Sequence, residues 1–250
     1  MNKVFCCFTC ERDLPLLNAH FAAIRHYDPS ALVYYIFDKS EQPQAPEGAY
    51  MLTTDFNRRN NLIGLECHWG MLNVMKQLAE INEADYVIKI DSDCYYINDF
   101  EDGYSLIGTA PGLSYYCKGC CYKISYESIL NCINYLKSSG YQDTTGRLED
   151  HLISMICAIT SQPGSVRILN AIDYNKEGEV DTINSCIFQS GYFNYTDDLS
   201  NVKYWIDCGD KKFVDDYDEA NLPKPLAKAR AMEFLLNYFI KKPHIDLELG

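Results

Sequence analysis

The feature that most constrains the fold of this chain is a series of short apolar runs that each end at polar residues. The runs are Val4–Phe8, Ala31–Phe37 and Tyr86–Ile90. Their length and composition predict strands, and their continuous rather than alternating apolar character favours a parallel sheet that is covered on both faces. Segments with helical spacing separate the runs. We therefore expect an α/β fold with an open, mostly parallel sheet flanked by helices, followed by an α+β C-terminal part.

Apolar residues at helical spacing predict four helices between and after these strands. The first follows Asp13, which we expect to be its N-cap, and the second begins at Gly64. Ser125 is expected to cap the third helix, which Gly140 closes, and the fourth begins near Leu148. Further strands are expected at Leu113–Cys117, Cys120–Ile124, Val166–Ile172 and Val202–Ile206.

The net charge of the chain limits the classes of partner. It is −13, from 22 Lys and Arg against 35 Asp and Glu, and no basic stripe with interleaved aromatic residues is present. A phosphate backbone would be repelled, so we do not expect nucleic acid as a partner. An anionic small molecule would meet the same repulsion unless a divalent cation offset it.

Twelve cysteines are present, two pairs of them in Cys-x-x-Cys spacing at Cys7–Cys10 and Cys117–Cys120. Two such pairs could form a tetrahedral zinc site. However, Cys6–Cys7 and Cys120–Cys121 lie in apolar runs, which is typical of buried cysteines that act as small hydrophobic residues. We expect the second interpretation.

The first residues bear on the location of the protein. The apolar run that begins at Val4 ends at Cys10 and is followed by three charged residues, without a small-residue cleavage site. This pattern predicts a first strand rather than a signal peptide, and no stretch approaches the roughly 20 apolar residues that a membrane span needs. We expect a cytoplasmic protein with reduced thiols.

Polar groups gather where the predicted strands end. The three positions are Thr9 to Arg12, Asp38, and Asp91-Ser92-Asp93. Open parallel sheets bind ligands at the carboxyl ends of their strands, and both carboxylates of an Asp-x-Asp can converge on one cation where the backbone turns. Carboxylate oxygens suit Mg²⁺ or Mn²⁺, which can bridge a diphosphate.

The Asp-x-Asp has three other interpretations. It could be a solvated turn in which an Asp caps the next element. A haloacid dehalogenase-type phosphatase normally carries this motif at the end of its first strand, whereas here it follows a later strand. A calcium loop is disfavoured because Tyr95 and Tyr96 stand where a ligand and a Gly are required.

Several segments, in order, resemble the GT-A fold glycosyltransferases that use nucleotide sugars. Val87–Asp93 is similar to the family's DxD segment, and Asn61–Gly64 with Ala84–Tyr86 resembles the approach to it in bacterial members. Gly119–Ser125 looks like the acceptor-side strand, and Leu148-Glu149-Asp150 resembles the acidic "xED" motif. The resemblance covers roughly residues 1–160.

The resemblance implies a role for each matching residue on the donor side. Thr9, Arg12 and Asp38 would lie beside the nucleotide, and Ser92 would belong to the same site. Asp91 would contact the ribose or the metal. Asp93 would bind the Mn²⁺ or Mg²⁺ ion and, through it, the diphosphate of a donor for which UDP-sugars are favoured.

On the acceptor side the resemblance implies catalysis by Asp150, beside Glu149. Asp150 would accept the proton of the acceptor hydroxyl. Both residues lie in the first turn of a predicted helix, where carboxylates are also favoured by the helix dipole alone. His244 is the only C-terminal candidate for a third metal ligand, and His151 is expected to be a neighbour of the base rather than a ligand.

The absence of repeats and low-complexity segments favours one domain over residues 1–250. Residues 1–110 would form the nucleotide-sugar half, 111–222 the acceptor-side half, and 223–250 a C-terminal helix and tail. The expected enzyme is a hexosyltransferase of polysaccharide biosynthesis, with a carbohydrate or lipid-linked acceptor. Inversion is favoured over retention, but both remain open, as does a binding protein that keeps the fold without turnover.

The C-terminal segment leaves two interpretations open. Five basic residues and one acidic residue lie between Lys224 and Lys242, and an apolar face runs from Met232 to Phe239. A basic amphipathic helix can bind an anionic membrane, which would make the enzyme peripheral to the inner membrane face. The favoured alternative is that this face packs on the domain.

Overall fold

The structure of the chain is a computed structural model. The structure describes residues 1–39, 43–56, 65–92, 94–96, 99–110, 116–117, 119, 121–140, 149–170 and 187–189.

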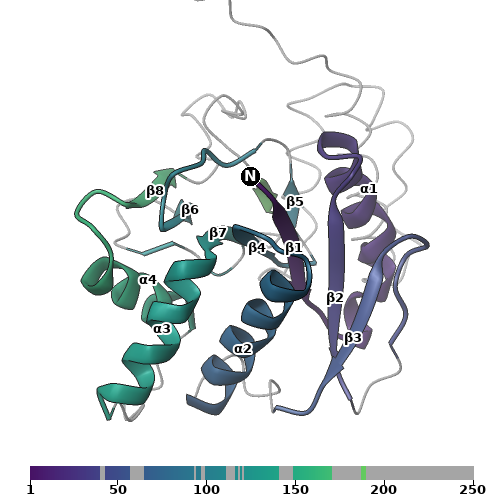
Figure 1. Ribbon diagram of the computed structural model, residues 1–250. Coiled ribbons are helices and arrows are strands. Elements are labelled where there is room, and N and C mark those ends of the chain that lie inside the picture. The colour runs from purple at the N-terminus through teal and green to yellow at the C-terminus, as the bar shows by residue number, and fades with distance from the viewer. Residues whose placement is uncertain are drawn as a thin grey trace, which may run out of the picture.

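A seven-stranded, mostly parallel sheet forms the centre of the molecule (Figure 1). In sequence order, its strands are β1 (Lys3–Phe8), β2 (Leu32–Asp38), β3 (Tyr50–Thr54), β4 (Tyr86–Ile90), β6 (Leu106–Ala110), β7 (Cys121–Ser125) and β8 (Val166–Asn170). Their spatial order is β3-β2-β1-β4-β7-β6-β8. Only β7 runs against its neighbours within this sheet. The expected α/β sheet is therefore confirmed.

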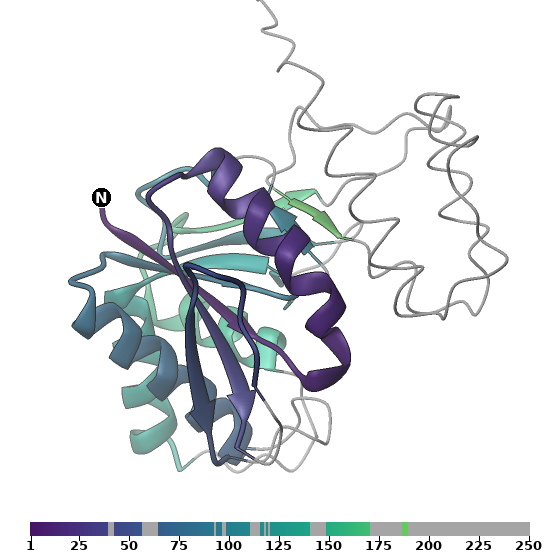
Figure 2. The same cartoon turned by 90° about the vertical axis from the view of Figure 1, so that its right-hand side faces the viewer.

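Helices cover both faces of this sheet (Figures 1 and 2). The short 3-10 helix η1 (Glu11–Leu16) leads into α1 (Leu17–Tyr27), which covers one face. The other face is covered by α2 (Leu65–Ile81), α3 (Tyr126–Ser138) and α4 (Glu149–Thr160). A second sheet pairs β5 (Cys94–Tyr96) with β9 (Ile187–Gln189) in antiparallel fashion, and α1 packs against β5.

Two hydrophobic cores result from the alternation of side chains along the strands. On β1, Val4 and Cys6 face the helices α2 to α4, whereas Phe5 and Cys7 face α1. Both cysteines are fully buried, as expected for small hydrophobic residues. Among the described residues no group of three His, Cys, Asp or Glu side chains could hold a metal, so nothing there favours the zinc interpretation.

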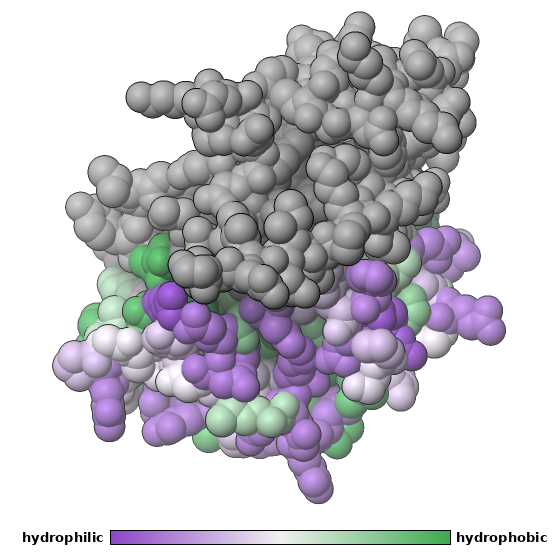
Figure 3. Space-filling view, turned by 90° about the horizontal axis from the view of Figure 1, so that it is seen from above, coloured by the Kyte–Doolittle hydropathy of each residue, from purple (hydrophilic) through white to green (hydrophobic). Residues whose placement is uncertain are grey.

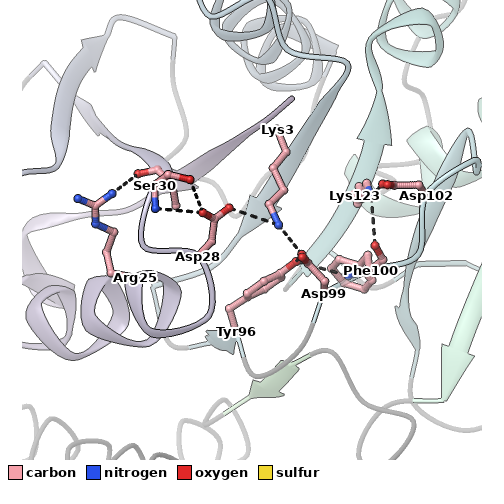
Figure 4. Close-up of polar contacts among 10 residues, drawn as sticks. Lys3, Arg25, Asp28, Ser30, Tyr96, Asp99, Phe100, Asp102 and Lys123 are labelled. Carbon is pink, nitrogen blue, oxygen red and sulfur yellow. Dashed lines mark hydrogen bonds and ion pairs between the residues drawn. The ribbon is translucent and has the colours of Figure 1, made fainter. Parts of the chain in front are cut away.

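Ion pairs connect neighbouring segments to the amino-terminal end of β1 (Figure 4). Lys3, at the start of β1, contacts Asp28 at 3.4 Å and Asp99 at 2.5 Å. Asp99 also accepts a hydrogen bond from the Tyr96 hydroxyl. Lys3 therefore ties the end of α1 and the segment after β5 to the central strand.

The structure agrees with most of the expected elements. The strand at Tyr86–Ile90 has the expected bounds, and the side chain of Ser125 accepts a hydrogen bond from the Ser128 amide at the start of α3. Helix α4 ends at Thr160 and is followed by β8, close to the predicted strand.

Three predictions about local structure are wrong or incomplete. Asp13 is not the N-cap of α1, because it lies inside η1 and no side chain caps α1. Residues 116–117 are not in a strand, and β6 lies earlier in the chain than the strand expected at Leu113–Cys117. The edge strand β3 was not predicted at all, because its residues are largely exposed and lack a continuous apolar run.

Several expectations concern residues outside the described part of the chain. They are the strand at Val202–Ile206, the C-terminal helix and tail, and the single-domain organisation that depends on them. These stay predictions.

The contact between Gly70 of α2 and Phe56 explains a glycine in the middle of a helix. A Cβ atom at Gly70 would lie 2.3 Å from Cγ of the Phe56 ring, which is closer than van der Waals contact allows. Phe56 itself is 9% exposed and belongs to the core below α2. The segment before α2 is thus pressed directly onto the helix backbone.

We therefore expect Gly70→Ala to lower the free energy of unfolding by about 1–3 kcal/mol, the usual cost of overpacking. The Phe56 ring has to move, and the free-energy cost of this movement exceeds the gain of about 1 kcal/mol from alanine's helix propensity. Urea denaturation measures the change. In a Phe56→Ala background the same substitution should become stabilising, and a loss of equal size in both backgrounds would show that the ring is not the cause.

Candidate functional site

The order of the strands places a topological switch point at the carboxyl ends of β1 and β4. The chain leaves β1 through α1 towards β2 on one side, and it enters β4 through α2 from the opposite face. In α/β sheets the crevice outside the carboxyl ends of strands at such a switch point is where ligands bind. The predicted residues Thr9, Asp91 and Ser92 follow these two strands directly.

Asp91 lies at this edge above a buried lysine. Its side chain is 34% exposed, whereas that of Lys89, two residues earlier on β4, is 0% exposed. The lysine Nζ is 2.5 Å from Oδ1 of Asp91. The backbone carbonyl of Asp91 accepts a hydrogen bond from the amide of Cys94 at 3.0 Å, which turns the chain into β5. Asp91 is therefore both oriented and accessible to solvent.

Ser92 connects the end of β4 to the loop after β1. Its hydroxyl donates a hydrogen bond to Oδ2 of Asp13 at 2.8 Å, and the thiol of Cys10 lies 3.4 Å from the same oxygen. The Asp13 carboxylate, expected to cap a helix, instead joins the two strand ends. It adds a second acidic side chain to the edge that carries Asp91.

A buried histidine supports the same turn from below. His20 of α1 is 0% exposed, and its Nδ1 is 2.7 Å from the hydroxyl of Tyr35 on β2. Burial lowers the pKa of His20 to about 3, and a hydrogen bond with the backbone of Asp91 acts in the opposite direction. The ring is therefore uncharged, and it packs between α1, β2 and the turn at Asp91.

The two expected acceptor-side carboxylates are buried at the start of α4. Asp150 is 6% exposed, and its oxygens accept hydrogen bonds from the amides of Gly119, at 2.8 Å, and His151, at 2.7 Å. Glu149 is 1% exposed and accepts a hydrogen bond from the Tyr122 hydroxyl at 3.3 Å. These contacts hold both carboxylates in fixed orientations.

Gly119 allows these carboxylates to approach the segment before β7. A Cβ atom at this position would lie 3.1 Å from Oε2 of Glu149 and 3.3 Å from Oδ2 of Asp150. The carbonyl of Gly119 accepts a hydrogen bond from Lys89, and its amide donates to Asp150. Gly119 thus contacts both Lys89 and Asp150.

The electrostatic environment of Glu149 is unusual. Burial raises the pKa of Glu149 to about 7, and the carboxylates of Asp150 and Asp91 add to the effect, while Lys89, at 3.9 Å, opposes it. Burial and the same Glu149 raise the pKa of Tyr122 well above its usual value, so this hydroxyl stays protonated and can donate. Glu149 can therefore hold or release a proton near neutral pH.

The remaining predicted site residues are Thr9, Asp38, Arg12, Asp93 and His244. Thr9 is buried, and its amide donates to the carbonyl of Ile36 at 3.0 Å, which extends the pairing of β1 with β2. Asp38 ends β2 at the same sheet edge, on the far side of β1 from Asp91. Arg12 lies in η1, but its side chain is outside the described part, as are Asp93 and His244.

The groups at this end of the sheet fit a hard cation that is held by a protein carboxylate together with a phosphate of a bound molecule. Asp91 offers a solvent-accessible carboxylate, the donor type that Mg²⁺ and Mn²⁺ use. Within the described ranges, no group of three His, Cys, Asp or Glu side chains is arranged to hold a metal. Such ions are often bound by one or two carboxylates together with substrate phosphates, so Asp91 would need Asp93 or a phosphate ligand as a partner.

The sequence indicated no functional-site role for Lys89, Asp13, His20 or Tyr122, and Asp13 was expected only as a helix cap. Lys89 carried a usable signal, because a lysine inside an otherwise apolar strand requires a buried partner. The other three gave no such signal, since their contacts come from segments far away in the chain.

No protein-family model matches the chain, and no curated protein sequence is significantly similar to it. The site consists of the solvent-accessible carboxylate of Asp91 at the switch point, connected through Lys89 and Gly119 to two buried carboxylates on α4.

The pKa of Glu149 predicts a pH-dependent contribution to stability. Because the pKa is higher in the folded chain, near 7 against 4.5, the folded state binds more protons between these values. The free energy of unfolding should then fall as the pH rises through this window, by up to about 3 kcal/mol from this group. In Glu149→Gln this part of the pH dependence of the free energy of unfolding should be lost. Urea denaturation from pH 4.5 to 7.5 measures it.

Glu80→Gln is a suitable control for this measurement. Glu80 is exposed, and a hydrogen bond from Lys76 lowers its pKa, so its contribution has the opposite sign. An unchanged slope in Glu149→Gln would show that Glu149 is ionised in the folded state throughout the window.

Proposed function

We propose that this protein is a glycosyltransferase that moves a sugar from a nucleoside-diphosphate sugar to an acceptor hydroxyl with the help of Mn²⁺ or Mg²⁺. The observation that carries the proposal is the contact set of Lys89. Its Nζ is 2.5 Å from Asp91 of the Asp-x-Asp segment and 3.9 Å from Glu149 of the Leu148-Glu149-Asp150 segment. Two motifs that the resemblance assigns to donor and acceptor therefore lie next to one another.

On the donor side, Asp91 and Asp93 would hold the cation, and Asp13 and Ser92 would shape the floor of the nucleotide site. Asp91 has an accessible carboxylate, and the Ser92–Asp13 hydrogen bond fixes the turn that carries it. The bound cation would supply charge stabilisation for the diphosphate leaving group. Thr9, Arg12 and Asp38 would surround the base and ribose, with His244 as a candidate third ligand.

On the acceptor side, Asp150 would act as the general base. The acceptor oxygen attacks the anomeric carbon, the bond from this carbon to the diphosphate breaks, and the hydroxyl proton passes to Asp150. The amides of Gly119 and His151 orient this carboxylate. With its pKa near 7, Glu149 could share the proton. Inversion at the anomeric carbon is the outcome that such a base favours.

The proposed enzyme is cytoplasmic. Its favoured donor is a UDP-sugar, and its acceptor is a carbohydrate or a lipid-linked molecule. No helix in the described ranges has the length and apolar character that crossing a bilayer requires. The described surface seen from above is mainly hydrophilic (Figure 3). Membrane contact through the C-terminal helix concerns residues outside the described part.

A second candidate is a nucleotide-sugar or metal-binding protein that does not catalyse transfer. The low exposure of Glu149 and Asp150, 1% and 6%, favours it, because a base must reach its substrate. Release of UDP from UDP-sugars, measured with and without Mn²⁺, separates the two candidates. A thermal-shift screen of nucleotide sugars with Mn²⁺ identifies the donor, since a ligand of the folded state raises stability with concentration.

Asp91→Asn tests the donor site. The substitution removes one negative charge while keeping the shape, so the affinity for the donor with Mn²⁺ should fall by at least about tenfold. Calorimetric titration measures it. Asp99→Asn is a matched control, because Asp99 also contacts a lysine at 2.5 Å but lies at the opposite edge of the sheet. Equal affinities in both variants would contradict the assignment of Asp91.

Asp150→Asn tests the base. It should leave donor binding intact and lower kcat by a factor on the order of 10²–10⁴, the usual contribution of a general base. Parallel losses of donor binding and rate would remove Asp150 from this role. A product with the donor's anomeric configuration would instead indicate a retaining mechanism.

A further inference from the structure

Lys89 is a buried cation that the proposed reaction does not itself use. Its side chain is 0% exposed, on a strand whose other residues are apolar or aromatic. An ammonium group is costly to bury unless charges and hydrogen bonds compensate it. The compensation comes from three segments, through Asp91, the Gly119 carbonyl and Glu149.

The contacts of Lys89 continue to the second carboxylate of α4. The carbonyl of Gly119 accepts from Lys89, while the amide of the same residue donates to Oδ2 of Asp150 at 2.8 Å. Asp91 and Asp150 are thereby linked through one ammonium group and one glycine. A displacement of Lys89 would remove one contact of Asp91 and one contact of the glycine that orients Asp150.

A second buried lysine gives a standard for comparison. Lys123, on the neighbouring strand β7, is 2% exposed, forms an ion pair with Asp102 and donates to the carbonyl of Phe100 at 3.2 Å (Figure 4). Its nitrogen also lies 4.4 Å from the centre of the Tyr86 ring. These partners lie on the opposite face of the sheet from Lys89, away from the two acidic motifs.

We propose that Lys89 is a positioning residue that holds the donor-side carboxylate Asp91 and, through Gly119, the acceptor-side carboxylate Asp150 in one fixed arrangement. The inference rests on the proposed glycosyltransferase function. Lys89 acts through these residues and does not contact substrate, since it is fully buried beneath Asp91.

Removal of the Lys89 charge is expected to lower kcat without weakening the binding of a divalent cation, and this combination is diagnostic. Loss of the ammonium frees Asp91 and Gly119, so the reacting groups are no longer aligned and kcat falls. The same loss removes a positive charge next to Asp91, so the site becomes more attractive to a divalent cation. A purely structural lysine would instead weaken metal binding and rate together.

The experiment compares Lys89→Met with the matched control Lys123→Met. Binding of Mn²⁺ alone is measured by calorimetry or by electron paramagnetic resonance, and kcat for sugar transfer is measured at saturating Mn²⁺ and donor. In Lys89→Met we expect kcat to fall by about 10–100-fold, while the dissociation constant for Mn²⁺ stays the same or decreases by up to about tenfold. In Lys123→Met the kcat of folded protein should stay within about threefold of the wild type.

Lys89→Gln provides a second variant if the methionine substitution prevents folding. Glutamine keeps a hydrogen-bond donor for the Gly119 carbonyl but carries no charge, and it should show the same combination with a smaller loss of kcat. Parallel weakening of Mn²⁺ binding and kcat in folded protein, or wild-type values of both, would overturn the positioning role. If the wild-type chain binds Mn²⁺ but transfers no sugar, the proposed function fails as well. That result is distinguishable because it appears before any substitution is made.

Discussion

The structure depends on the parallel pairing of β1 with both β2 and β4. Because β1 is buried between two parallel neighbours, its side chains must be apolar on both faces, and the helices before β2 and before β4 must cover opposite faces. The same arrangement forces polar groups to the strand ends, where the backbone turns away from the core. Asp13, Asp91 and Ser92 collect at one edge for this reason. The position of the candidate site is thus a consequence of the strand order.

Lysines that pair with acidic side chains serve different purposes at different places in the sheet. At the amino-terminal edge, Lys3 joins Asp28 and Asp99, and this contact holds peripheral segments against β1. Near the carboxyl ends of the strands, Lys89 joins the accessible carboxylate of Asp91 to the buried carboxylate of Glu149. Burial of charge alone therefore does not identify a site. The buried partner Glu149 and the position at the switch point distinguish Lys89 from Lys3 and Lys123, whose partners Asp99 and Asp102 are exposed.

The sequence predicted the central part of the fold because burial leaves a direct signature in composition. β4 was predicted with its correct bounds, since an apolar strand between a helix and an acidic turn has few other interpretations. β3 was missed because Tyr50, Met51 and Leu52 are exposed at the sheet edge and show no burial pattern. β6 was missed because Gly108 interrupts it. That glycine is required, since a Cβ atom there would lie 2.8 Å from side-chain atoms of both Cys117 and Tyr122.

The candidate site was predictable only in part, because its chemistry depends on contacts between distant segments. The sequence pointed to Asp91, Glu149 and Asp150 through two local motifs, but it could not show that Lys89 connects them or that Asp13 accepts from Ser92. It also could not distinguish the two adjacent carboxylates of α4. Asp150 receives two backbone amides, whereas Glu149 receives a tyrosine hydroxyl and a more distant ammonium. Neighbouring acids in such different environments are suited to different steps of proton handling, with one oriented firmly and the other able to exchange its proton near neutral pH.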